Sequence, residues 1–206
     1  MVRPIVIVTF LFLNYLRGAE AFAQVIPLND LDTARVFFDL NKAIENRENA
    51  LRLDLSKQKL FDFPEEIFQL TNLQELKLNK CRITELPDLF DSLPNLQRLL
   101  CQHNEITNLP PSLLQLKNLK VLDLADNIIE VIPSEIDRLS QLETLSLWDN
   151  PITTYPESLT NMQRLKVFDL LNNAISRETQ QRLKEGLPEC KLIMSPPCAC
   201  MDGDNY

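Results

Sequence analysis

The chain has 206 residues, 45% of them hydrophobic and 24% charged, which is the composition of a folded protein long enough to bury a core. Its formal net charge of -8 disfavours phosphate backbones and anionic lipid surfaces, so we expect neither nucleic acid nor such a membrane surface as a partner. With 3 glycines and 1 histidine, the chain has little material for a phosphate-binding loop or for histidine-based catalysis.

Residues 1–23 differ from the rest of the chain. Arg3 precedes an apolar run over 5–13, and an Ala-Phe-Ala triplet that ends at Ala23 has the small-x-small pattern of a signal peptidase site. The run is shorter than the ~20 apolar residues that cross a bilayer. We predict a signal peptide over 1–23, cleavage between Ala23 and Gln24, no stable membrane span and a secreted or periplasmic location. A membrane tether or a misassigned start is the alternative.

A linker and a capping helix are expected over 24–49. Residues 31–49 are amphipathic, with apolar side chains at helical spacing at Val36, Phe37, Leu40, Ala43 and Ile44. Such a helix would cover the open edge of the first strand, which could otherwise pair with other chains.

From Ala50 onward the chain repeats a 23-residue unit without insertion. The unit reads Leu-x-x-Leu-x-Leu-x-x-Asn and continues with an apolar-Pro pair, and its first position falls at Ala50, Leu73, Leu96, Leu119, Leu142 and Leu165. A fixed period of this length indicates a solenoid, in which the units stack on one another to bury a continuous core. We predict repeats over 50–175, as five full units and a partial sixth.

Each unit contains three kinds of structural position. The Leu-x-Leu segment alternates as a strand does, so we expect its leucines to point into the core. The asparagine can pair with backbone groups where the chain leaves the strand, and Cys81 replaces it in the second unit. The proline ends the strand and favours a short helical or 3₁₀ segment on the opposite side.

The units resemble leucine-rich repeats of the 23-residue kind, as in a bacterial-type secreted or scaffold-like protein of that family. The resemblance implies an α/β fold, a curved right-handed solenoid or horseshoe. Its parallel strands would line the concave face and its short helical or 3₁₀ segments the convex face, behind a helical N-terminal cap. It also implies protein recognition on the concave face and no enzymatic activity.

The outward positions of the strands vary from unit to unit and are the candidates for partner contact. One column changes from basic to acidic along the solenoid, and the next column places a tryptophan beside a leucine. Aromatic residues concentrate in binding hot spots, although isolated apolar residues and solvated charges are also ordinary on surfaces. We select six candidate contacts: Lys80, His103, Asp126, Trp148, Asp149 and Leu171. Use of the convex face stays open.

Residues 176–194 are expected to cap the other end of the stack. Ser176 can cap a helix through Leu183, with Gly186 just beyond it, and an extended segment follows. Residues 195–206 are expected to form a flexible tail.

No set of residues is typical of an enzyme. We expect His103 outward and Cys101 inward on one strand, which prevents a Cys–His pair. Carboxylates near Asp126 could gather into one site, although a hydrated acidic face is the simpler interpretation. In the tail, Cys198 and Cys200 could form a disulfide or an incomplete metal site. We expect no catalytic residue, no cofactor and no metal.

The sequence therefore predicts a monomeric, non-catalytic protein-binding module, secreted or periplasmic, that recognises a protein on its concave face. One alternative is an intracellular or membrane-tethered signalling scaffold of leucine-rich repeat type. A more distant alternative is a metal-dependent hydrolase.

Overall fold

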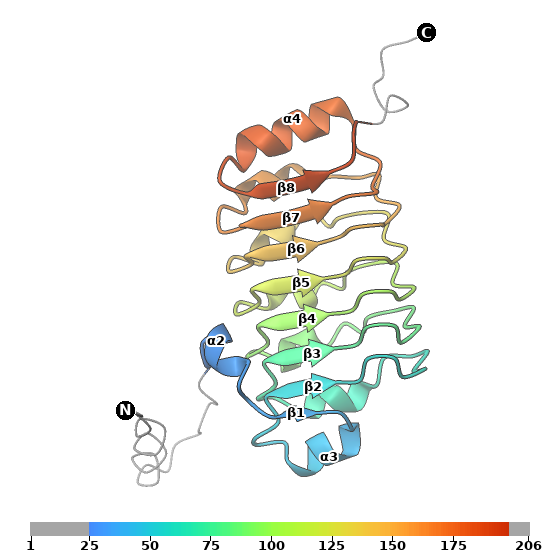
Figure 1. Cartoon of the computed structure of the whole chain (residues 1–206), viewed down its shortest axis with the longest axis vertical. Coiled ribbons are helices and arrows are strands. Elements are labelled where there is room, and N and C mark those ends of the chain that lie inside the picture. The colour runs from blue at the N-terminus through green and yellow to red at the C-terminus, as the bar shows by residue number, and fades with distance from the viewer. Residues whose placement is uncertain (1–24, 198–206) are drawn as a thin grey trace, which may run out of the picture.

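The computed structural model describes residues 25–197, so the predicted signal peptide over 1–23 and the tail cysteines Cys198 and Cys200 lie outside the described residues. Within that range the strands form one parallel sheet in chain order, as Figure 1 shows. The strands are β1 (Val36–Phe37), β2 (Arg52–Asp54), β3 (Glu75–Lys77), β4 (Arg98–Leu100), β5 (Val121–Asp123), β6 (Thr144–Ser146), β7 (Val167–Leu170) and β8 (Lys191–Met194).

Strand register follows the 23-residue period. Between β5 and β6, Leu122 lies opposite Leu145 and Asp123 lies opposite Ser146. The same offset joins every neighbouring pair from β2 to β7. In each of the central strands the leucine is buried and its two neighbours are half-exposed. The predicted solenoid, with one strand per unit, is confirmed.

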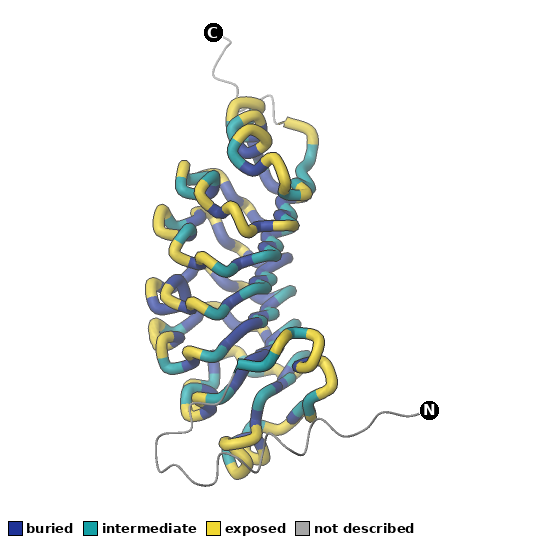
Figure 2. Tube along the Cα trace, turned by 90° about the vertical axis from the view of Figure 1, so that its left-hand side faces the viewer, coloured by how far each residue is buried: buried dark blue, intermediate teal, exposed yellow. Residues whose placement is uncertain are grey.

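The core fills the space between the sheet and a series of 3₁₀ helices (Figure 2), and its buried apolar residues form one cluster along the stack. Pro64 and Pro156 immediately precede the first and last of these helices, where a fixed φ suits the first turn. The predicted short segments opposite the sheet are therefore confirmed as η1 (Glu65–Gln69), η2 (Phe90–Ser92), η3 (Leu113–Gln115), η4 (Ile136–Arg138) and η5 (Glu157–Asn161).

The N-terminal end differs from the single helical stretch expected over 31–49. Val36–Phe37 forms β1 and pairs with β2, and only α3 (Leu40–Glu45) is helical in the second part of the stretch. The Oδ1 of Asp39 accepts a hydrogen bond from the Lys42 N–H at 2.9 Å, so the helix begins after Asp39. Val36 and Phe37 supply backbone partners for the edge of β2, which a helix at this place would leave unpaired.

The C-terminal end holds α4 (Arg177–Gly186), and the Ser176 Oγ accepts a hydrogen bond from the Thr179 N–H at 3.1 Å, as predicted for a cap. The helix is longer than expected, because Gly186 is its last residue and has no positive φ. Glycine is needed there for close approach, since an added Cβ would lie 2.5 Å from the Thr160 Cβ. None of the helices within residues 25–197 has the length and apolar character to cross a bilayer.

Candidate binding surface

We call the sheet surface that points away from the core the outer face. It consists of three columns of side chains that run across the strands. The first is Arg52, Glu75, Arg98, Val121, Thr144 and Val167, the second is Asp54, Lys77, Leu100, Asp123, Ser146 and Asp169, and the third is Ser56, Asn79, Gln102, Ala125, Trp148 and Leu171.

The residue after the third column has a left-handed backbone in every unit, with φ between 53 and 67° at Lys57, Lys80, His103, Asp126, Asp149 and Asn172. Its N–H continues the ladder between units, as where Asp126 donates to the Trp148 carbonyl at 2.7 Å and Asp149 donates to the Leu171 carbonyl at 2.8 Å. Aspartate, asparagine and histidine tolerate this conformation better than most residues. The recurrence of these residue types was the available sequence signal for a backbone role that we did not predict.

The structure brings five of the six selected residues together on neighbouring units. Trp148 is half-buried and Leu171 is exposed, and the hydrogen bonds above link them to Asp126 and Asp149. The His103 Nδ1 contacts the Asp126 Oδ2. Lys80 is exposed but lies in the second unit, far along the stack from Trp148 in the fifth.

A buried ion cluster that we did not predict occupies the first half of the outer face. The carboxylate of Glu75, which is 1% exposed, accepts the Arg52 Nε–H at 2.8 Å and lies 2.7 Å from the Arg98 Nη2. Asp32 lies 2.5 Å from the same Arg98 nitrogen, and this hydrogen bond lowers the pKa of Asp32. The Arg-Glu-Arg alternation at 23-residue spacing was visible in the sequence.

Residues 26–34, which we call the N-terminal strap, lie along the first column of this half of the face, where the strands begin (Figure 1). The Ile26 N–H donates to the Gln74 Oε1 at 3.1 Å, and the Ile26 carbonyl accepts from the Gln97 Nε2 at 2.7 Å. Leu31, in helix α2 (Leu28–Leu31), is fully buried. Figure 1 shows α2 beside β3 and β4, away from the end of the stack that α3 occupies.

The other half of the outer face, over β5–β7, is acidic and partly apolar. Val121, Thr144 and Val167 remain half-exposed there, next to Trp148 and Leu171. Burial raises the pKa of Asp123, and the nearby charge of Asp169 adds to this effect. Hydrogen bonds from the Ala125 N–H and the Gln102 Nε2 act in the opposite direction.

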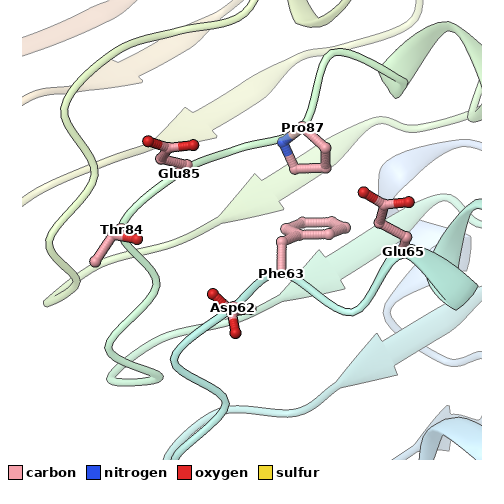
Figure 3. A pocket seen from close by; sticks show the side chains of 6 residues that line it. All are labelled: Asp62, Phe63, Glu65, Thr84, Glu85 and Pro87. Carbon is pink, nitrogen blue, oxygen red and sulfur yellow. The ribbon is translucent and has the colours of Figure 1, made fainter.

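One shallow cavity lies near the start of the repeat stack. This cavity of about 400 Å³ between the first two units is lined by Asp62, Phe63, Glu65, Thr84, Glu85 and Pro87 (Figure 3), and its three carboxylates lie at separate positions around it. Across the described chain, residues 25–197, no three His, Cys, Asp or Glu side chains are placed to hold a metal ion. Cys101 is fully buried and His103 is half-exposed, so their inward and outward placement is as predicted.

The leucine rich repeat family model matches residues 49–106 and 94–152. Among solved structures, a leucine-rich repeat protein of Leptospira interrogans is 30% identical to this chain, with a TM-score of 0.65. The match covers 72% of this chain and 44% of the Leptospira protein. An internalin from Listeria monocytogenes is 20% identical (77% and 49% covered, TM-score 0.62), a level that shows the fold alone. A chain of the Toll–Spätzle complex from Drosophila is 28% identical (62% and 18% covered, TM-score 0.58). The chain thus spans less than half of each of these relatives. No curated protein sequence is significantly similar to it.

Proposed function

Since the chain belongs to the leucine-rich repeat family, we propose that it is a non-catalytic module that binds a protein partner on the outer face over β5–β7. The observation that carries this proposal is the pair Trp148 and Leu171, which is accessible on the half of the face away from the strap. Tryptophan is enriched in interface hot spots. One of the similar structures was itself solved as a complex, Toll with Spätzle.

The remaining selected residues extend this contact surface. Asp126 and Asp149 flank the Trp148 backbone, and His103 adjoins Asp126. Lys80 would meet only a partner that reaches along the stack to the second unit. The footprint of the partner would therefore centre on the fourth to sixth units, with His103 at its border and Lys80 beyond it.

A double substitution tests the assignment of this face. Trp148→Ala/Leu171→Ala in the tagged mature chain should lower recovery of the partner from native extract about tenfold. The matched control is Ile128→Ala/Val131→Ala, which also removes two exposed apolar side chains (48% and 50% exposed) but outside the three outer columns. Circular dichroism should show the same fold for both variants. Unchanged recovery by the first variant, or equal loss in the control, would contradict the assignment.

We also propose that the chain is a secreted or periplasmic monomer that begins at Gln24 after processing. The apolar run over 5–13 and the triplet ending at Ala23 support this location. Terminal sequencing of the protein recovered from its native host should return Gln24 first. Retention of 1–23 would favour the membrane-tethered scaffold instead. Light scattering on the processed protein should give the mass of one chain.

A further inference from the structure

The N-terminal strap already shows how a polypeptide segment docks on the outer face. Its apolar Leu31 is fully buried, its Ile26 backbone pairs with the side chains of Gln74 and Gln97, and its Asp32 pairs with Arg98. The first half of the face also carries Arg52 and Lys77 around the buried Glu75. An acidic segment thus covers the first column of this half, where Arg52 and Arg98 lie.

The open half of the face has the opposite charge. Its three columns and the left-handed column over the fourth to sixth units contain no Lys, Arg or His and four carboxylates: Asp123, Asp126, Asp149 and Asp169. Within residues 25–197 the Asp149 and Asp169 carboxylates form no ion pair, and Asp126 meets only His103. Two lysines border this half: Lys166 is paired with Glu143 at 2.6 Å, and the exposed Lys191 lies opposite Val167 in the neighbouring strand β8.

Building on the proposed function, we propose that the segment bound over β5–β7 is extended and basic. Its apolar side chains would pack on Trp148 and Leu171, while its Lys or Arg side chains would approach Asp126, Asp149 and Asp169. Opposite charges across an interface favour encounter and select against wrong partners. An acidic segment would add repulsion to carboxylates that already lie on strands about 4.8 Å apart.

The single tryptophan of the chain makes this proposal directly measurable, because Trp148 is the only residue whose indole emission can respond. The probe is an unlabelled peptide of repeated Lys-Thr-Val units, which contains no fluorophore of its own. Its counterpart has Glu in place of Lys. The lysine peptide should shift or quench Trp148 emission in a saturable way, and its affinity should fall as salt rises. The glutamate peptide should leave the emission unchanged. Equal responses to both peptides, or a lysine response that salt does not weaken, would overturn the proposal.

Charge-neutral variants locate the contact. Asp126→Asn/Asp149→Asn removes two carboxylates, and asparagine suits the left-handed position, as Asn172 shows in the sixth unit. The Kd for the lysine peptide should rise about fivefold or more. The control Glu65→Gln/Glu85→Gln removes the same charge around the cavity of Figure 3 and should change the Kd little. Equal weakening in both variants would mean that net charge, not this surface, attracts the peptide, and would refute the site.

The outcome for the basic segment can be separated from the outcome for the binding face. If Trp148→Ala/Leu171→Ala abolishes partner recovery but Asp126→Asn/Asp149→Asn leaves the lysine peptide affinity unchanged, the face is right and the basic segment is wrong. If the Trp148 and Leu171 substitutions have no effect on partner recovery, the proposed function itself fails.

Discussion

The Cys81 Sγ donates a hydrogen bond to the Leu55 carbonyl at 3.2 Å, and the Asn104 Nδ2 makes the equivalent bond to the Leu78 carbonyl at 2.8 Å one unit later. Both donors reach back 26 residues to the end of the preceding strand. In the second unit, the Cys81 thiol therefore replaces the donor of the asparagine amide. It cannot supply the acceptor oxygen with which Asn104 receives the Ile83 N–H at 3.1 Å.

This relationship predicts that Cys81→Asn is tolerated. The amide should keep the bond to Leu55 and add an acceptor, so the free energy of unfolding should stay equal or rise by up to about 1 kcal/mol. The same change at the buried Cys101, which takes a leucine position, should cost about 3 kcal/mol because it buries an amide without partners. Urea unfolding of the two variants provides the comparison. If Cys81→Asn is as destabilising as Cys101→Asn, Cys81 does not occupy a position that suits asparagine.

Asn127 should be among the most sensitive polar residues in the chain. Its Nδ2 donates to the carbonyls of Cys101, Leu124 and Ala125, and its Oδ1 accepts the Ile106 N–H at 3.0 Å. Asn127→Ala leaves these buried backbone groups unpaired, so we expect a loss of about 3 kcal/mol in unfolding free energy. Asn108→Ala, at an exposed position, should change stability by less than about 0.5 kcal/mol. Comparable effects at both sites would show that the hydrogen bonds of the buried Asn127 contribute little to stability.

The ion cluster predicts a strong effect of removing one charge. Glu75→Gln leaves the largely buried Arg52 and Arg98 with only the exposed Asp32 as a carboxylate partner, so stability should fall by about 3 kcal/mol. Hydrogen exchange at Ile26 and Leu31 should also speed up, because Arg52 and Arg98 hold the strap through Asp32. Glu85→Gln, an exposed substitution of the same kind, is the control. A Glu75→Gln protein with unchanged exchange in the strap would contradict this coupling.

The solenoid could be predicted from the sequence because every unit carries the same residue pattern within 23 consecutive positions. The leucines, asparagines and prolines recur every 23 residues, and each has the same backbone task in every unit. The strap has no such pattern. Its hydrogen bonds join Ile26 to residues 48 and 71 positions away in sequence, so only the assembled sheet shows where it lies.

The binding surface was predictable in part for the same reason. Strand alternation placed Trp148 and Leu171 in one column, and the register between β6 and β7 agrees with that placement. Alternation alone could not tell which first-column residues are covered, because this depends on the strap. It also could not separate a surface charge from a backbone requirement, as at His103, Asp126 and Asp149.

Replacing Gly186 with alanine should lower the free energy of unfolding, although helix propensity alone would predict an increase. Alanine in a helix is normally favoured over glycine by up to about 1 kcal/mol. At Gly186 the new Cβ would meet the Thr160 Cβ and Cγ2 at 2.5 Å, so Gly186→Ala should instead destabilise the protein by about 2 kcal/mol. Adding Thr160→Gly should recover part of this loss in thermal unfolding. A stabilised Gly186→Ala single variant would mean that α4 and η5 separate easily.

Asp123 should impose a pH dependence on stability. Burial raises its pKa above the ordinary 3.8, so between these two values the folded chain retains a proton that the unfolded chain has released. Stability therefore falls as pH rises through this window, with a slope of at most about 1.4 kcal/mol per pH unit. Asp123→Asn removes this titration, so its unfolding free energy minus that of the wild type should increase from about pH 3 to about pH 7 in urea titrations. Asp91→Asn, at an exposed aspartate, corrects for the loss of one charge. A flat difference would mean that the bonds from Ala125 and Gln102 offset the effect of burial, and one that decreases with pH would mean that they outweigh it.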